Sequence, residues 1–184
     1  MCVTLKRITA LNLNDAVRIQ AELFPKESAR VNYEESIDGT TDYEYFLLYE
    51  GDDCVGITGL YHSPGDHENA WLGWFGIRAG ARRRGLGSEA LRLYEEMAVA
   101  RGYRFARLYT GAVDNDVAIA FYRSNGYSSE PYCCVEDPAC QKCRVLIFSK
   151  ALDGQRLIPW GNRNIHLTEQ FAKEELGSAR RADR

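Results

Sequence analysis

The clearest periodic pattern in the chain is an apolar stripe near the middle of the sequence. Leu86, Ala90, Leu93 and Met97 follow one another at spacings of four, three and four residues. This spacing places the four side chains on one side of an α-helix, so it predicts an amphipathic helix packed against a core. Gly102 is expected to end that helix, because glycine readily adopts the left-handed conformation found after helix C-termini.

Short apolar runs separated by turn residues predict strands on both sides of this helix. The runs at 45–49 and 54–61 flank turn residues at 51–53, which predicts a β-hairpin. The aromatic segment 69–78 follows a turn at 63–66 and predicts a third strand of the same sheet. Further strands are predicted at 2–9, 104–110, 127–136 and 142–150, and further helices at 12–23, capped by Asn12 or Asn14, at 33–37 and at 115–125. In this order the elements predict an α+β domain with a mixed, mostly antiparallel sheet.

The composition shifts after Leu152, which predicts a domain at 1–152 followed by a C-terminal appendage at 153–184. The appendage holds a turn at 158–161 with an apolar anchor, Trp160, a short predicted helix at 166–176 and a polar tail. Trp160 and this helix could pack on the body of the domain or on a second subunit, so a homodimer is one of two arrangements left open.

Length and charge exclude several classes of protein. A chain of 184 residues fits one domain with a core of its own. Its net charge of −3 argues against a protein that binds nucleic acids without sequence preference, because such binding needs a broad basic surface. No apolar stretch approaches the roughly 18 residues of a membrane span, and the N-terminus lacks the pattern of a secretory signal. A cytoplasmic location is therefore the expectation.

Four cysteines crowd into one short segment: Cys133, Cys134, Cys140 and Cys143. A four-thiolate zinc cage is awkward there, because adjacent residues of a strand point to opposite faces. We expect reduced, structural thiols, with zinc or a disulfide as the alternatives. The histidines show no ligand spacing, so no metal is expected.

The segment Arg82-Arg83-Arg84-Gly85-Leu86-Gly87-Ser88 lies between a predicted strand and the amphipathic helix. The first backbone amides of a helix have no partner within the helix and attract phosphate. The glycines allow a phosphate to approach the backbone closely, and the arginines attract a ligand with several negative charges. A turn with solvated arginines would show the same pattern, so the loop alone is a weak signal.

About 28 residues after Gly87 comes the frame Asn115-x-x-Ala118-x-x-x-Tyr122-x-x-x-Gly126-Tyr127. Together with Arg82-x-x-Gly85-x-Gly87, it resembles the GNAT superfamily of acyl-CoA-dependent N-acetyltransferases. The resemblance covers about 50 residues at the level of motifs and approximately 2–150 in the order of elements. It implies splayed fourth and fifth strands, helices on both faces of the sheet, and acetyl-CoA as cosubstrate.

The resemblance also assigns roles to residues. The loop amides would hold the coenzyme diphosphate, the strand ending at Ile77 would pair with the pantetheine arm, and Tyr122 would lie near the sulfur. A phenol keeps its proton at neutral pH and can pass it to a leaving thiolate, so Tyr122 is the expected general acid. The expected coenzyme contacts are Phe75, Ile77, Arg82, Arg83, Arg84, Gly85, Leu86, Gly87, Ser88, Asn115, Ala118 and Tyr122.

The chain departs from the family at the general base. Many relatives carry a carboxylate on the fourth strand, at positions that are Trp71 and Gly73 here. Glu68 is the expected substitute, acting through water, with Asp66 and Glu44 as alternatives. Four aromatic residues are candidates to line an acceptor pocket: Tyr33, Tyr61, Trp71 and Trp74.

Together these features predict an enzyme that moves an acetyl group from acetyl-CoA to a primary amine by direct attack. A small-molecule acceptor is favoured, a protein or peptide acceptor is the alternative, and a non-catalytic acyl-CoA-binding module is the rival from another class.

Overall fold

A computed structural model describes residues 2–63, 65–113, 115–132, 145–161 and 163 of the chain. The chain divides into two compact units. The first unit comprises residues 1–106 and 151–155, and the second unit comprises residues 107–150 and 156–184.

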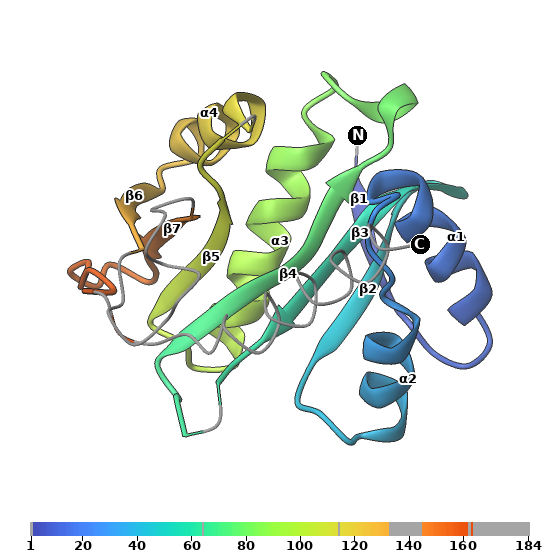
Figure 1. Cartoon of the computed structure of the whole chain (residues 1–184), viewed down its shortest axis with the longest axis horizontal. Helices are drawn as coiled ribbons and strands as arrows, with labels where there is room; N and C mark the ends of the chain where they lie inside the picture. The colour runs from blue at the N-terminus through green and yellow to red at the C-terminus, as the bar shows by residue number, and fades with distance from the viewer. Residues whose placement is uncertain (1, 64, 114, 133–144, 162, 164–184) are drawn as a thin grey trace, which may run out of the picture. The chain divides into compact units, whose positions relative to one another are not determined.

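The first unit is built on four antiparallel strands that follow one another in chain order (Figure 1). Apolar residues pair across them, as Leu5 does with Leu48 and Leu47 does with Ile57. The predicted hairpin is confirmed, because the strands on either side of the turn at 51–53 pair directly. The strands are β1 (Val3–Arg7), β2 (Glu44–Glu50), β3 (Asp53–Tyr61) and β4 (Asn69–Ile77).

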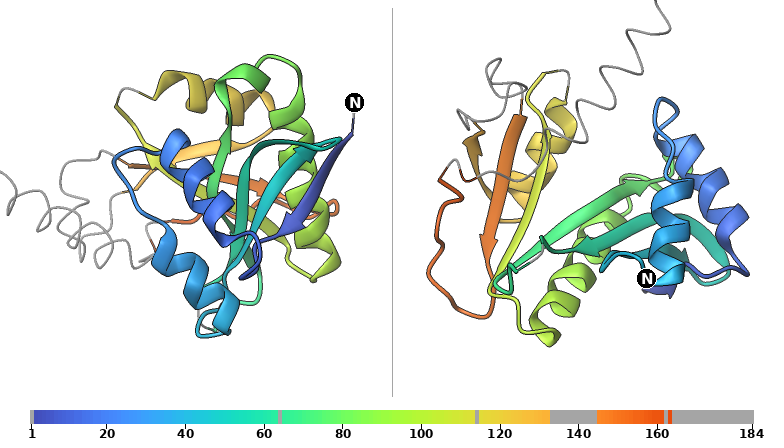
Figure 2. Two further views of the ribbon diagram at one scale, coloured as in Figure 1. Left: turned by 90° about the vertical axis from the view of Figure 1, so that its right-hand side faces the viewer. Right: turned by 60° about the horizontal axis from the view of Figure 1, so that its bottom comes forward.

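Helices lie on both faces of these four strands (Figure 2). The helices α1 (Leu13–Leu23) and α2 (Arg30–Asp38) pack on one face, in a core cluster that includes Leu47. The helix α3 (Leu86–Ala100) packs on the other face, in a cluster that includes Leu48. Adjacent strand residues point to opposite faces, so two neighbouring leucines serve two separate cores.

The apolar stripe of α3 is confirmed by burial. Leu86 and Ala90 are buried, together with Tyr94 on the same side of the helix. The Tyr94 hydroxyl donates a hydrogen bond of 2.7 Å to the carbonyl of Ala70 and so ties the helix to β4. Gly102 has φ 84°, as expected for the residue that ends the helix.

The second unit contains β5 (Phe105–Gly111), α4 (Asp116–Ser124), β6 (Ser128–Pro131) and β7 (Val145–Ala151), although β5 begins and β7 ends in the first unit. Its strands lie in the order β5-β7-β6, and β6 and β7 are antiparallel. Tyr122 packs its ring against Tyr127 and Phe148, with ring centroids 6.1 and 5.4 Å apart. The predicted α+β class with mostly antiparallel strands is confirmed.

Three local predictions need correction. The side chain of Asn12 does not cap α1; its Oδ1 accepts a hydrogen bond from the amide of Thr9, and its Nδ2 donates one to the carbonyl of Arg7. The helix predicted at 33–37 is longer, because residues 30–32 and residue 38 also belong to it. The strand predicted at 127–136 begins at Ser128 and its described part ends at Pro131.

Trp160 packs on the body of the second unit. It is 4% exposed, and its ring lies 5.3 Å from the guanidinium carbon of Arg107 and 4.0 Å from that of Arg163. The backbone amide of Trp160 donates a hydrogen bond of 2.9 Å to Glu130. The cysteine segment and the helix predicted at 166–176 lie outside the described residues, and the division at 152/153 stays a prediction.

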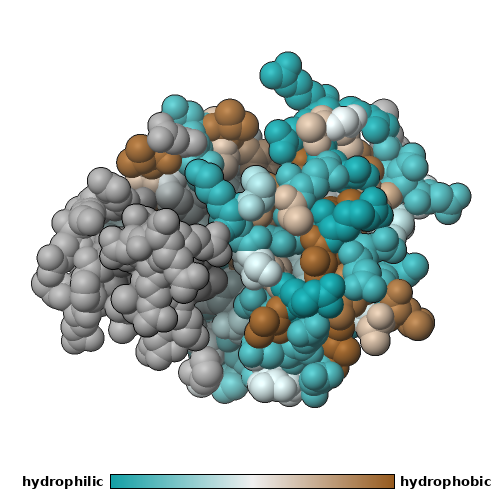
Figure 3. Space-filling view, turned by 45° about the vertical axis from the view of Figure 1, so that its right-hand side comes forward, coloured by the Kyte–Doolittle hydropathy of each residue, from teal (hydrophilic) through white to brown (hydrophobic). Residues whose placement is uncertain are grey.

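On the face shown in Figure 3, hydrophobic side chains reach the surface as small patches among hydrophilic ones. Exposed large hydrophobic residues of the first unit include Leu11 and Val31. Within the described part of the chain, no helix combines the length and apolar character that crossing a bilayer requires.

Candidate functional site

Strand β4 is irregular in its second half. Gly59 of β3 pairs with Gly73 of β4, whereas Ile57 pairs with Gly76, so β4 has one residue more than β3 in this interval. Trp74 lies in the interval and has φ 41°, a conformation that bulky residues rarely adopt. These are the marks of a β-bulge. Because a bulge takes one residue out of the ladder, its backbone groups become candidates to bind a ligand.

The segment after β4 has two residues in the left-handed conformation. A short 3-10 helix at Ala79–Ala81 is followed by Arg83, with φ 59°, and Gly85, with φ 79°. Only glycine adopts such angles without a steric cost, so the strain falls on Arg83. These turns lead the backbone directly into the first turn of α3, as the sequence predicts.

The N-terminus of α3 has no side-chain cap. Gly85 occupies the capping position, and no side chain hydrogen-bonds to the amides of the first turn. Among the described residues, the amides from Arg83 to Ser88 have no hydrogen-bond partner. The loop therefore presents unpaired donors at the positive end of a helix of 15 residues, as a phosphate site requires.

The three arginines of the loop have different surroundings. Arg82 turns back and donates a hydrogen bond of 2.8 Å from Nε to the carbonyl of Ile77. Arg84 forms an ion pair of 2.8 Å with Glu50 at the end of β2. Arg83 has no ion-pair partner among the described residues. Arg83 is therefore the cation most available to an anionic ligand.

The loop has room for a diphosphate. A Cβ built on Gly85 would meet no atom within 4 Å. Arg82, Arg83 and Arg84 are all exposed, whereas Leu86 is buried and anchors the start of the helix. Unpaired amides, open space and an available guanidinium fit the predicted coenzyme group.

The other predicted contacts, Asn115, Ala118 and Tyr122, belong to the second unit. Asn115 occupies the capping position of α4, and its Nδ2 donates a hydrogen bond to the hydroxyl of Thr110 on β5. Ala118 is half-buried on the first turn of α4. Asn115 thus connects the end of the strand to the start of the helix that carries Tyr122.

Tyr122 lies in an apolar environment. It is 7% exposed, and the ring of Phe121 contacts it from one side, with centroids 5.3 Å apart. Burial raises the pKa of Tyr122 above its ordinary value, because the phenolate is poorly solvated there. The phenol therefore holds its proton at neutral pH, as a general acid must.

The β4 face that packs toward α1 and α2 is aromatic. The ring of Trp71 stacks on Tyr61 at 6.3 Å, and that of Trp74 meets Phe24 edge-on at 5.3 Å. A Cβ on Gly73 would point at the ring of Tyr61, 3.4 Å away. Of the four predicted pocket aromatics, Tyr33 and Trp71 are buried, whereas Tyr61 and Trp74 are half-buried. Only the half-buried pair offers surface to a ligand.

The three candidate bases all have partners. Glu68 forms an ion pair with Arg104, and Glu44 is held between Arg7, at 3.3 Å, and Arg101, at 2.8 Å. The carboxylate of Asp66 accepts hydrogen bonds from the amides of residues 68 and 69 and from the side chain of Asn69.

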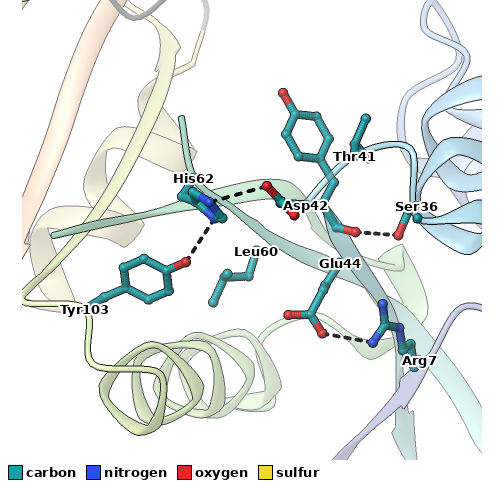
Figure 4. A pocket seen from close by; sticks show the side chains of 10 residues that line it. Arg7, Ser36, Thr41, Asp42, Glu44, Leu60, His62 and Tyr103 are labelled. Atoms are coloured by element: carbon teal, nitrogen blue, oxygen red, sulfur yellow. Dashed lines mark hydrogen bonds and ion pairs between the residues drawn. The ribbon is translucent and has the colours of Figure 1, made fainter. Parts of the chain in front are cut away.

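Sequence reasoning missed a pocket of ≈ 290 Å³ in the first unit (Figure 4). The His62 ring lies between the hydroxyl of Tyr103, 3.0 Å from Nδ1, and the carboxylate of Asp42, 3.6 Å from Nε2. Glu44 forms another part of the wall. These residues come from separate parts of the chain, so no local sequence motif predicts the pocket.

Comparison with known proteins identifies a family. The sequence model described as "Acetyltransferase (GNAT) family" matches residues 12–127. No curated protein matches the chain significantly.

Solved structures with the same fold include the following three acetyltransferases. An aminoglycoside 6'-acetyltransferase type Ii has a TM-score of 0.66 at 16% identity, covering 85% of this chain and 100% of its own. RimL, a ribosomal L7/L12 alpha-N-protein acetyltransferase in complex with coenzyme A, has a TM-score of 0.64 at 12% identity, covering 84% and 97%. A GNAT family acetyltransferase from Elizabethkingia anophelis with acetyl-CoA bound has a TM-score of 0.57 at 17% identity, covering 82% and 98%. The expectation that acetyl-CoA is the cosubstrate agrees with the last two.

Proposed function

Because the chain belongs to the GNAT family of acetyltransferases, we propose that it transfers an acetyl group from acetyl-CoA to a primary amine. The observation that carries this proposal is the set of unpaired backbone amides between Arg83 and Ser88, at the uncapped N-terminus of α3. Oriented amides at a helix terminus favour a phosphate group, and acetyl-CoA carries a diphosphate.

In the proposed complex, Arg83 neutralises part of the diphosphate charge, and the amides of the loop hold the phosphate oxygens. When bound, acetyl-CoA supplies an activated thioester. Backbone amides at the β4 bulge around Trp74 are the candidates to stabilise the negative charge that develops on its carbonyl oxygen. Direct attack by the amine needs no covalent enzyme intermediate.

Tyr122 donates the proton in this scheme. Burial raises the pKa of Tyr122, so the phenol stays protonated at neutral pH and can donate to the departing sulfur. Because its phenolate is more basic than a thiolate with a reference pKa of about 8.5, Tyr122 then regains a proton, which the amine nitrogen loses as the amide forms. Asn115, which precedes the same helix, and Ala118, in its first turn, are proposed to contact the pantetheine arm.

The small-molecule and protein acceptors remain the two candidates for the substrate. Structures of both kinds share the fold, since one acts on aminoglycosides and another on a ribosomal protein. The half-buried rings of Tyr61 and Trp74 favour a small acceptor with an apolar group. A peptide acceptor would need a more polar binding surface.

An amine panel that follows the release of free coenzyme thiol tests the proposal. We expect thiol release with at least one class of amine, a large loss of turnover in Tyr122→Phe, and unchanged coenzyme affinity of that variant by calorimetry. Tight coenzyme binding with no turnover across the panel would instead identify an acyl-CoA-binding module.

A further inference from the structure

Attack on a thioester requires an amine without its ammonium proton. An alkylamine with a pKa like that of lysine, about 10.4, is neutral in fewer than about one molecule in a thousand at pH 7. An enzyme that acetylates such an amine therefore needs a group to take up the proton. An amine of low basicity is already neutral and needs no such group before it attacks.

The β4 face toward α1 and α2 supplies no such group. The segment 70–77 has the sequence Ala-Trp-Leu-Gly-Trp-Phe-Gly-Ile, without an ionisable side chain. The bulge brings Trp74 onto the same face as Gly73, and the Cβ direction of Gly73 points to the rings of Tyr61 and Tyr45. The surface offered to an acceptor is therefore aromatic.

Three carboxylates around this face, those of Glu22, Glu44 and Glu68, have arginine partners. Glu22, at the end of α1, forms an ion pair of 2.9 Å with Arg78, and this hydrogen-bonded partner lowers the pKa of Glu22. Glu44 is held by two arginines and Glu68 by one. A carboxylate engaged by a guanidinium must give up that interaction before it can accept a proton, which weakens it as a base.

Three further titratable side chains of the first unit, those of Tyr33, Tyr43 and His62, are also poor bases for this face. Burial raises the pKa of Tyr33 and of Tyr43, so both phenols stay protonated at neutral pH. His62 is turned toward Tyr103 and Asp42 in the pocket of Figure 4. The described residues of the first unit thus present rings to an acceptor and no free proton acceptor on β4.

We propose that the acceptor is a weakly basic amine carried on an aromatic ring, such as an arylamine or an arylhydrazine. This inference rests on the proposed acetyl transfer and names its substrate class. Such an amine is neutral at physiological pH, so it needs no base before it attacks. Its nitrogen loses a proton as the amide forms, and this proton returns through water to Tyr122, which has protonated the leaving thiolate. The half-buried rings of Trp74, Phe24 and Tyr61 provide faces and edges against which an aryl group stacks.

The first test compares amines that differ in basicity and share a ring: aniline and phenylhydrazine against benzylamine. With acetyl-CoA at pH 7, we expect kcat/KM at least about tenfold higher for the weakly basic pair. For benzylamine, kcat/KM should rise about tenfold per pH unit up to the pKa of the amine itself. The pH profile should show no ionisation of an enzyme group.

The outcomes separate the two proposals. Two results would overturn the weakly basic acceptor and leave acetyl transfer standing. One is faster turnover of benzylamine than of aniline and phenylhydrazine at pH 7, and the other is a pH profile of kcat/KM that levels off at the ionisation of an enzyme group. No thiol release with any amine overturns both. Turnover of the weakly basic pair alone supports both.

A second test installs the missing carboxylate. Gly73→Glu places a carboxylate on the aromatic face, with Gly73→Gln as the matched neutral control; the first side-chain atom fits, because its nearest contact is 3.4 Å. At pH 7 the Glu-to-Gln ratio of kcat/KM should be at least about fivefold for benzylamine and near one for aniline. Equal ratios for both amines, in variants with unchanged melting temperatures, contradict the proposal.

Discussion

Arg84 and Glu50 form an ion pair of 2.8 Å between Nη2 and Oε2, which ties the loop before α3 to the end of β2. The neighbouring Arg83 has no such partner among the described residues and adopts a left-handed conformation. Two consecutive arginines with the same charge therefore have different surroundings. Arg84 holds the loop in place, and Arg83 is free to meet a ligand.

Arg83→Ala is expected to weaken coenzyme A binding about fivefold, because a partly exposed charge pair contributes about 1 kcal/mol. Arg84→Ala should weaken it less, since that guanidinium is already engaged by Glu50. Calorimetry at two salt concentrations measures both. Equal effects of the two substitutions would contradict the assignment.

Gly87→Val is expected to raise the dissociation constant of coenzyme A at least about tenfold, because a branched side chain obstructs the approach of phosphate to the amides. Gly80→Ala is the matched control, because its Cβ would meet no atom within 4 Å. It should bind as the parent protein does. Unchanged affinity of Gly87→Val would remove the loop from the site.

Gly85→Ala and Gly39→Ala separate backbone strain from binding. Both glycines have positive φ, 79° and 73°, and both have open space at Cβ. Each alanine should cost about 1 kcal/mol of folding stability, measured by chemical denaturation. Only Gly85→Ala should also weaken coenzyme binding, because Gly39 ends α2 and takes no part in the loop.

Tyr122→Phe is expected to lower kcat by roughly two orders of magnitude, as general acids commonly contribute that much. Because burial raises the pKa of Tyr122, activity should not decline through loss of this proton until the pH exceeds the ordinary tyrosine value of about 10. A pH–rate profile of both proteins checks this. A decline below pH 9 that disappears in Tyr122→Phe would contradict it.

Tyr33→Phe is expected to leave stability at neutral pH unchanged or raise it by up to about 1 kcal/mol, because the buried Tyr33 hydroxyl has no hydrogen-bond partner among the described residues. The matched control is Tyr94→Phe, which removes the hydrogen bond to Ala70 and should cost about 1 to 2 kcal/mol.

Tyr33→Phe and the parent protein can also be compared at alkaline pH. Burial raises the pKa of Tyr33 in the folded protein, so its contribution to stability is complete below the unfolded value of about 10 and is lost as the pH rises above it. Denaturation midpoints measured between pH 9 and 11 should fall less steeply in Tyr33→Phe than in the parent.

Local patterns predicted much of the fold. The spacing of Leu86 and Ala90 identified α3, and turn residues located the β2–β3 hairpin. Helix α2 was predicted too short, because it buries only Tyr33 and Ser36 and so carries little apolar periodicity.

Long-range contacts limited the prediction of the site. The partners of Glu44 and Glu68, Arg101 and Arg104, are 57 and 36 residues away in the chain, so no local pattern shows that these carboxylates are engaged. The loop at 82–88 was recognisable because its chemistry depends on consecutive backbone amides. The placement of Tyr122 relative to that loop stays a prediction.

The extra residue in β4 changes which side chains share a surface. In a regular strand, Trp71 and Trp74 would point in opposite directions, because an odd interval separates them. Here the extra residue shifts the alternation by one position. Both indoles therefore lie on the side of α1 and α2, and Phe75 and Ile77 reach the core beneath α3. A regular strand of the same length would instead turn Phe75 and Ile77 toward α1 and α2, so the extra residue decides which hydrophobic core receives the end of β4.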